Sequence, residues 1–460
     1  MKPIRLILAT LFVLSIQSTA FRAQRPLPHD LESKIEVIAN KMLERPVAGI
    51  SIAVAVDGKL QFVRGYGKAN LEHSVRVTPE TVFHIASVSK NILAAVVLQL
   101  ADQGKLSLDD DVKKFIPEAP TQSRHVTIKQ LLNHTSGIFS FTSLPDALNN
   151  ERFDMSHEQV FDLFRNKPFD FEPGTRWRYD NSAFYLAGVV VERVTKQDYA
   201  TYVREHVFKP LDMETASLCD AKMIVPHLAS GYEVAKGKLL NASFLSWKLP
   251  WAAGAVCATA TDLIKWEAAL DSGRVLSAAG LKLMRSPTVL DDGVMIDYGL
   301  GSRLGSLDGH KIFGHTGSGG GFRAMVETFP EDHLTIVVLM NTGNGSDAAA
   351  IMGADIYRAV MGLMPPKVLD LPVPARELAA IINARLDSDD GPVESFSKEG
   401  KLFFRIPGTS FELPMLRRAE NVFNVQDVNT MVLFTIRDGH VIWGQAYAGG
   451  LFMDAKYRVN

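Results

Sequence analysis

A serine and a lysine stand three residues apart just before a long apolar run. Ser87 precedes Lys90, and residues 92–98 are all apolar. If a helix begins at Ser87, the two side chains lie on the same helical face and within reach of each other. A hydroxyl beside an amine can become a nucleophile with its own base. The pair is therefore a candidate catalytic centre.

Spacing alone is weak evidence for chemistry, because the chain contains a second Ser-x-x-Lys at Ser395 and Lys398. Serine is a common helix N-cap, and a lysine one turn later commonly faces solvent. The second pair adjoins Glu399-Gly400, which favours a hairpin turn, so we assign it no catalytic role. The rest of the chain has to decide the role of the first pair.

Three further segments could complete a site around Ser87. Tyr179 and Asn181 follow a Pro-Gly turn, and His315 opens a glycine-rich stretch that reaches residue 321. Residues 131–138 end a helix at a glycine. Glycines remove side chains from a strand edge, so that backbone N–H groups can approach a ligand closely.

The elements that must position these segments indicate an α+β fold. Between residues 87 and about 290 the apolar spacing is mainly helical. On both sides of this region the sequence predicts strands over 49–56, 60–67, 311–315, 322–329 and 334–340, and flanking helices over 29–45 and 346–361. We therefore expect an antiparallel sheet flanked by N- and C-terminal helices, with a large helical insertion lobe. The cleft between two such lobes is a usual place for a small ligand.

The two ends of the chain are predicted to lie outside this unit. Residues 1–20 have the charged start, short apolar run and small-residue ending of a secretory signal peptide, cut after Ala20. The alternative is an uncleaved membrane anchor. We expect an exported protein, periplasmic or secreted, with a main domain over 21–364. A proline-rich linker then leads to a small antiparallel β domain over 375–460.

Charge and cysteine usage narrow the class further. A formal net charge of −2 without a basic cluster gives no footprint for nucleic acid. Cys219 and Cys257 are the two cysteines. They could pair in an oxidising compartment, but the sequence does not place them together, and we favour two free thiols. Neither has a second ligand at metal-binding spacing, so no metal site is expected.

In their order along the chain, these segments resemble the serine hydrolases of the penicillin-binding-protein and class C β-lactamase-like family. That family includes D-Ala-D-Ala carboxypeptidases, D-amino-acid peptidases and related esterases. The resemblance spans about residues 30–362. The segments that carry it are Ser-x-x-Lys at 87–90, Leu-Leu-Asn-His-Thr-Ser-Gly at 131–137, Tyr-x-Asn at 179–181, the Ala-Gly-Ala segment at 253–263 and His-Thr-Gly at 315–317.

The resemblance implies a role for each residue. Ser87 would attack a carbonyl and form an acyl-enzyme, while Lys90 and Tyr179 share the proton transfers, with the choice of base left open. His315 would orient Tyr179 and the substrate or pass a proton to the leaving group. Residues expected to bind substrate are Asn181, Thr316, Gly317 and Ser318. The backbone N–H groups of Ser87 and Ser318 would form an oxyanion hole, and no metal or cofactor is implied.

Departures from the family pattern bear on substrate choice. His315 stands where β-lactamases of this class carry lysine, and Asp180 stands where the family usually has serine or alanine. A largely neutral histidine gives a weaker field for a substrate carboxylate. We therefore expect cleavage of small amide substrates, D-amino-acid peptides first, with a carboxylesterase, a β-lactamase and a non-catalytic ligand-binding relative as alternatives. His84 and His134 are interpreted as structural.

Overall fold

The structure is a computed structural model. It describes residues 28–144, 153–220, 222–343, 348–365, 370–382, 384–386, 393–398, 401–405, 412–425 and 430–457. The predicted signal peptide over residues 1–20 lies outside the described residues.

An antiparallel sheet forms the centre of the main unit, built from both ends of the sequence as predicted. In the order β11-β12-β13-β14-β1-β2, its strands are Arg303–Leu307, His310–Gly319, Phe322–Phe329, Leu334–Met340, Gly49–Val56 and Lys59–Asn70. The two halves of the chain meet where Ile50 on β1 pairs with Met340 on β14. The turn between β1 and β2 has positive φ at Asp57 and Gly58, the geometry that an Asp-Gly hairpin requires.

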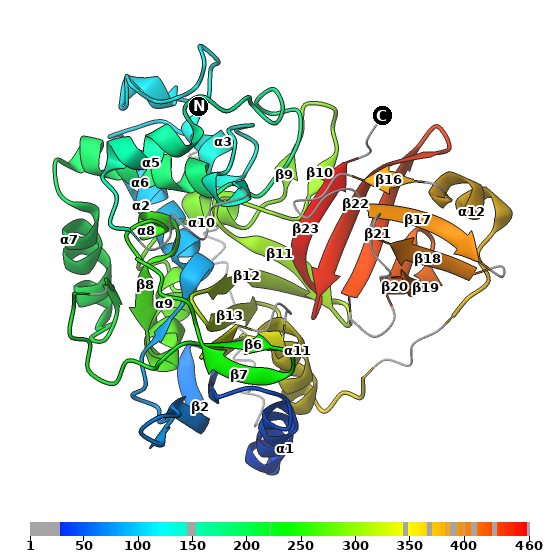
Figure 1. Ribbon diagram of the computed structural model, residues 1–460, viewed down its shortest axis with the longest axis horizontal. Helices are drawn as coiled ribbons and strands as arrows, with labels where there is room; N and C mark the ends of the chain where they lie inside the picture. The colour runs from blue at the N-terminus through cyan, green and yellow to red at the C-terminus, as the bar shows by residue number, and fades with distance from the viewer. Residues whose placement is uncertain are drawn as a thin grey trace, which may run out of the picture.

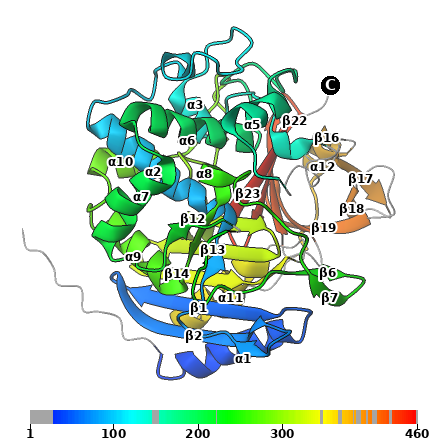
Figure 2. The same cartoon turned by 60° about the vertical axis from the view of Figure 1, so that its left-hand side comes forward.

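Helices cover both faces of this sheet. Helices α1 (Leu31–Leu43) and α11 (Ala348–Met361) pack together on one face. Helix α9 (Ala260–Asp271) packs on the other face against β1 and β14. Figure 2 shows α1 below β1 and β2, and the helices α5 and α6 of the insertion lobe above the sheet. The predicted α+β layering is confirmed.

The insertion lobe is mainly helical, as expected (Figure 1). Its α-helices are α2 (Ser89–Asp102), α3 (Ile128–Leu132), α5 (His157–Phe164), α6 (Asn181–Thr195), α7 (Tyr199–Val203), α8 (Trp251–Gly254), α9 and α10 (Ala278–Met284). Short helical turns are η1 (Ala86–Val88), η2 (Val112–Lys114), η3 (Phe141–Ser143), η4 (Arg204–Phe208) and η5 (Lys209–Leu211). Short strands are β3 (Val75–Arg76), β4 (Phe83–His84), β5 (Ser217–Leu218), β6 (Tyr232–Ala235), β7 (Lys238–Asn241), β8 (Val256–Ala258), β9 (Thr288–Val289), β10 (Met295–Ile296) and β15 (Thr342–Gly343).

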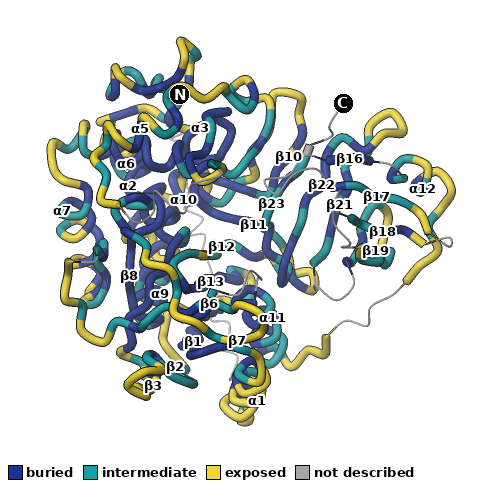
Figure 3. The backbone as a smooth tube through the Cα atoms, viewed as in Figure 1, coloured by how far each residue is buried: buried dark blue, intermediate teal, exposed yellow. Residues whose placement is uncertain are grey.

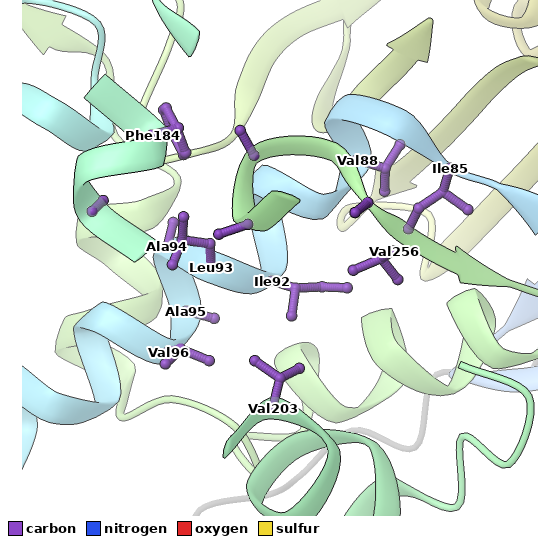
Figure 4. Close-up of a cluster of buried hydrophobic side chains, with 14 of the residues drawn as sticks. Ile85, Val88, Ile92, Leu93, Ala94, Ala95, Val96, Phe184, Val203 and Val256 are labelled. Atoms are coloured by element: carbon purple, nitrogen blue, oxygen red, sulfur yellow. The ribbon is translucent and has the colours of Figure 1, made fainter. Parts of the chain in front are cut away.

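Helix α2 runs through the core of this lobe. It is apolar on nearly every side, which is typical of a fully buried helix. Figure 4 shows Ile92 and Val96 of α2 among Phe184, Val203 and Val256, which come from α6, α7 and β8. Packing on all sides fixes the position of the residues at the start of α2.

The C-terminal residues form a β-rich unit beside the main sheet, as expected. Its elements are α12 (Ala375–Ile381) and strands β16 (Arg385–Leu386), β17 (Val393–Lys398), β18 (Lys401–Arg405), β19 (Glu412–Ala419), β20 (Val422–Val425), β21 (Thr430–Arg437), β22 (His440–Ala448) and β23 (Leu451–Tyr457). Each strand pairs antiparallel with the next. Strand β23 also pairs with β11 of the main sheet through Leu451 and Gly305. Figure 3 shows that β23 and β11 are buried where they meet.

The expectation of two free thiols is wrong. Cys219 and Cys257 form a disulfide, with their Cα atoms 5.9 Å apart. Strand β5 pairs antiparallel with β8, which contains Cys257, and the N–H of Cys219 donates to the carbonyl of Ala255 at 2.9 Å. This strand pairing brings together residues that are 38 positions apart, a proximity that the sequence does not reveal.

Within the described ranges, the structure contains no helix that is both long enough and apolar enough to cross a membrane.

Candidate active site

Ser87 lies at a sharp junction between strand β4 and helix α2. The preceding residue, Ala86, has a φ of 45°, in the left-handed region that alanine rarely adopts. Two contacts stabilise this backbone: the hydroxyl of Ser89 donates to the Ala86 carbonyl at 2.6 Å, and the N–H of Ile85 donates to Val256 at 3.0 Å. The junction turns the Ser87 side chain away from the core and towards a cavity.

Lys90 reaches back to Ser87 from the first turn of α2, as the spacing predicted. Its ammonium Nζ lies 3.1 Å from Ser87 Oγ and 2.9 Å from the carbonyl oxygen of Ala253. The side chain is 1% exposed. Burial lowers the pKa of Lys90, and the nearby Tyr179 opposes that shift. A lysine whose pKa is lowered can accept the Ser87 proton.

Tyr179 lies on the loop before α6 and faces Lys90. The Lys90 ammonium is 5.0 Å from the centre of the Tyr179 ring, and the ring of His134 is 4.3 Å from it. The Tyr179 hydroxyl is buried and makes no hydrogen bond of standard geometry within the described part of the chain. Ser87, Lys90 and Tyr179 are thus brought together, with a buried hydroxyl available to a bound substrate.

Asp180 has a structural role in the described geometry. Its carboxylate caps helix α6 by accepting the N–H of Ala183 at 3.1 Å, and it accepts the Ser136 hydroxyl at 3.0 Å. Burial raises the pKa of Asp180 to about 7. This departure from the family pattern therefore positions the start of α6, where Asn181 is the first residue.

His315 belongs to a buried chain of hydrogen bonds. Its Nδ1 lies 2.5 Å from the carbonyl of Thr316, and its Nε2 lies 3.1 Å from the hydroxyl of Tyr298. The same hydroxyl lies 3.1 Å from Nε2 of His134, whose Nδ1 accepts the N–H of Asp180 at 3.0 Å. Burial lowers the pKa of both histidines well below the usual value.

These contacts fix the protons along the chain. The Thr316 carbonyl can only accept, so Nδ1 of His315 carries a proton, and the neutral ring uses Nε2 as an acceptor. His134 then donates from Nε2 to Tyr298, which donates to His315. The ring centres of His315 and Tyr179 are 6.4 Å apart. The Nε2 side of the His315 ring therefore faces Tyr298, and its Nδ1 side binds the backbone carbonyl of Thr316 in β12.

The glycine-rich strand β12 passes close to the backbone of Ile85 and Ser87. A Cβ atom on Gly317 would lie 2.1 Å from the carbonyl oxygen of Ile85 and 3.2 Å from the backbone nitrogen of Ser87. This close approach requires glycine. It also brings the next residue, Ser318, to the rim of the same cavity as Ser87. Ser87 and Ser318, whose backbone N–H groups are expected to form an oxyanion hole, thus line one cavity.

A cavity of about 110 Å³ opens above Ser87. Its lining residues are all uncharged: Ala86, Ser87, Phe141, Thr142, Asn181, Leu245, Trp247, Leu249, Pro250, Ala253, Gly254, Ser318, Gly319 and Gly320. Trp247 forms part of the wall and stacks on His84, with ring centres 3.8 Å apart. Burial lowers the pKa of His84 to about 3, so this histidine is a neutral support for the wall.

Of the four residues expected to bind substrate, two line the cavity and two lie beside it on β12. Asn181 lines the cavity, and its amide donates to Thr142 at 3.0 Å. Thr316 and Gly317 lie on β12 just before the cavity-lining Ser318. The Thr316 carbonyl accepts a hydrogen bond from Nδ1 of His315. Thr316 therefore helps to fix the strand, in addition to any contact with substrate.

Several residues of the site were not singled out from the sequence. Ala253 supplies the second acceptor for Lys90, although its segment was recognised as part of the family resemblance. Tyr298 bridges the two histidines, and Arg303 has its guanidinium carbon 5.6 Å from the Tyr179 ring centre. Tyr298 opens a Tyr-Gly-Leu-Gly segment, which signals a turn, but nothing local connects Arg303 to the site.

Comparisons with known proteins agree with this geometry. A protein-family model described as Beta-lactamase matches residues 35–359. Protein flp from Staphylococcus aureus strain MW2 is 33% identical over 216 residues, which cover 45% of this chain and 42% of that protein. The chain thus matches less than half the length of this curated relative.

Solved structures extend the likeness of the fold. The octameric penicillin-binding protein homologue from Pyrococcus abyssi has a TM-score of 0.65 and 24% identity, covering 94% of this chain and 100% of that one. A D-stereospecific amidohydrolase from Streptomyces sp. has a TM-score of 0.61 and 25% identity, covering 71% and 98%. With a family match over most of its length and a lysine in contact with the serine at the start of a buried helix, this chain belongs to the β-lactamase family of serine acyl-enzyme hydrolases.

Proposed function

We propose that this hydrolase cleaves small amide substrates built from D-amino acids, such as D-amino-acid peptides and amides, through an acyl-enzyme on Ser87. The observation that carries the proposal is the 3.1 Å contact between Ser87 Oγ and Lys90 Nζ at a buried position. An unassisted serine hydroxyl is a poor nucleophile, and a lysine with a lowered pKa supplies the missing base.

The reaction follows from the positions of these groups. Ser87 Oγ attacks the substrate carbonyl while its proton passes to Lys90. The backbone N–H groups of Ser87 and Ser318 stabilise the developing oxyanion. The buried hydroxyl of Tyr179, beside Lys90, returns a proton to the leaving amine. Water then attacks the acyl-enzyme with the same groups in reverse order and releases the acid.

The lining of the cavity argues against a substrate whose terminal carboxylate enters it. Its lining residues carry no charge, and burial keeps His315 neutral, so the described residues that line it offer no cation to a terminal carboxylate. Phe141, Trp247 and Leu249 offer apolar surface to a side chain. This disfavours release of a C-terminal residue that carries a free carboxylate.

The preference for D-amino acids is supported by similarity. The D-stereospecific amidohydrolase from Streptomyces sp. is 25% identical, and a D-amino acid amidase from Ochrobactrum anthropi shares the fold at 23% identity. Curated relatives include a putative penicillin-binding protein from Bacillus subtilis at 26% identity over 70% of this chain.

A panel of substrates tests the proposal. We expect ammonia release from D-alanine amide and D-phenylalanine amide, with the L-amides much slower, and an acylated Ser87 visible by intact mass. Fast turnover of p-nitrophenyl butyrate with no cleavage of D-amides would identify a carboxylesterase. Fast turnover of nitrocefin would identify a β-lactamase.

The nucleophile is tested separately by labelling with a fluorophosphonate probe. We expect Ser87→Ala to abolish both labelling and turnover. Ser395→Ala is the matched control, because it alters the other Ser-x-x-Lys, whose serine lies in β17 of the C-terminal β unit. Labelling of the Ser87→Ala protein at the wild-type rate would show that the nucleophile lies elsewhere.

Export is a second proposal, supported by the N-terminal pattern and by a disulfide, which is typical of oxidising compartments. N-terminal sequencing of protein recovered from an expressing bacterium should find Phe21 as the first residue. Retention of Met1 on cytoplasmic protein would contradict it.

A further inference from the structure

Arg303 is a buried cation with an unusual set of partners. Its residue is 8% exposed, and it makes no ion pair with a carboxylate among the described residues. Instead, its Nη1 donates to the carbonyl of Phe452 at 2.9 Å and to that of Met453 at 2.6 Å. Both carbonyls belong to β23 of the C-terminal β unit. A buried charge without a counter-ion is costly, so its retention calls for an explanation.

The charge of Arg303 points at the catalytic groups. Its guanidinium carbon is 5.6 Å from the centre of the Tyr179 ring, and the Lys90 ammonium is 5.0 Å from the same centre. The guanidinium carbon of Arg303 and Nζ of Lys90 are therefore at most about 11 Å apart. Carbonyl dipoles solvate the guanidinium but do not cancel its charge, so a positive field remains at Lys90.

The positive charge of Arg303 changes the pKa values of the neighbouring groups. Arg303 lowers the pKa of Lys90, adding to the larger effect of burial, and it does the same to His134 and His315. The titratable and charged groups around Lys90 are Tyr179, Asp180, His134, His315 and Arg303. Arginine does not lose its proton in proteins, so its charge favours the neutral forms of Lys90, His134 and His315.

The C-terminal β unit holds Arg303 in this position. The ring of Phe452 packs edge-on against Trp177, with centres 5.2 Å apart, and lies 6.5 Å from Tyr298. At the same junction, the N–H of Ser306 donates to the carbonyl of Gly450 at 3.0 Å. Strand β23 thus contributes backbone acceptors and an aromatic side chain to the surroundings of Tyr179.

We propose that Arg303 is a positioning residue, a fixed positive charge seated by β23 of the C-terminal β unit, that keeps Lys90 in its neutral, proton-accepting form. The C-terminal β unit is then a working part of the catalytic site through Phe452 and Met453. This inference rests on the proposed role of Ser87 as the nucleophile and of Lys90 beside it, but not on the identity of the substrate.

The test measures the rate of Ser87 labelling by a fluorophosphonate between pH 5 and pH 10, which needs no knowledge of the substrate. Arg303→Gln removes the charge but keeps a donor for the β23 carbonyls. We expect its acid limb to move to higher pH by about one unit, the effect of a unit charge about 10 Å away at an effective dielectric constant of about 20. Arg303→Lys retains the charge and should keep the acid limb near that of the wild type.

Arg417→Gln is the matched control, because Arg417 is another largely buried arginine, paired with Glu377 inside the C-terminal β unit. It should lower stability without moving the acid limb. An Arg303→Gln protein that labels with the wild-type acid limb and plateau rate would overturn the proposal. Absence of labelling in the wild type would instead overturn the proposed function itself.

A second variant keeps the proposal open to refutation if Arg303→Gln does not fold. Phe452→Leu retains the charge and the backbone carbonyls but removes the ring that packs on Trp177. We expect slower labelling and a smaller shift of the acid limb in the same direction. A folded Phe452→Leu protein with the wild-type profile would show that β23 does not control the site.

Discussion

Gly317 is the position where a single added carbon should have the largest effect on catalysis without touching a reacting side chain. An alanine Cβ there would lie 2.1 Å from the Ile85 carbonyl oxygen, whereas real Cβ atoms essentially never come within 3.0 Å of such a neighbour. The strand β12 and the segment before Ser87 must therefore separate by about 0.9 Å. Neither can yield easily, because both are backbone held in a close-packed core.

The expected cost follows from what lies on each side of this contact. Ser87 and Ser318 are the two proposed oxyanion donors, one from η1 and one from β12, so separation would pull one donor away. Loss of one such donor costs about 100-fold to 1,000-fold in kcat, or about 2.7–4 kcal/mol. Overpacking costs a further 1–3 kcal/mol or so of stability. The contact between Lys90 and Ser87 lies within one helix start, so the acid limb of the pH profile should not move.

The assay compares kcat for D-phenylalanine amide and the thermal midpoint of Gly317→Ala with those of the wild type. Gly319→Ala, two residues along the same strand, is the matched control, since its Cβ would meet its nearest neighbours at 4.0 Å. We expect a small change in that variant. A folded Gly317→Ala protein whose kcat stays within about tenfold of the wild type would refute the assignment of the oxyanion hole.

Two further predictions concern stability. Burial raises the pKa of Asp180 from its usual value of 3.8 to about 7, so its contribution to the unfolding free energy is fully present below about pH 4 and is lost as the pH rises through 7. Between pH 5 and pH 8, Asp180→Asn should therefore lose roughly 3 kcal/mol less unfolding free energy than the wild type. Equal losses of the two proteins in urea titrations would contradict this. The disulfide closes a loop with a separation of 38 residues, so Cys219→Ser with Cys257→Ser should lower the unfolding free energy by about 2–4 kcal/mol. An unchanged denaturation midpoint would show that the bond does not stabilise the fold.

The parts of the fold that depend on neighbouring residues were predictable. The Asp57-Gly58 hairpin follows from turn chemistry. The burial of helix α2 on all sides follows from the apolar run after Lys90. Within the region predicted to be mainly helical, helix α7 (Tyr199–Val203) continues as η4 and η5. Its apolar spacing therefore identified the segment but not the change in helical type.

The histidines show where sequence reasoning reached its limit. His134 was interpreted as structural, and the structure places it against the Tyr179 ring in a buried chain that ends at His315. A lone histidine beside a helix stop carries no sign of such a chain, because its partner Tyr298 comes 164 residues later. The orientation of His315 likewise depends on Tyr298 and not on its own neighbours in sequence.

The sequence by itself determined that Ser87 and Lys90 lie together, because they are separated by one helical turn and their contact is local. Tertiary structure alone decided which other groups surround them. The carbonyl of Ala253, the charge of Arg303 and the ring of Phe452 come from segments far apart in the chain, and the disulfide depends on the pairing of β5 with β8. Such contacts are set by the packing of whole elements, which no local spacing records.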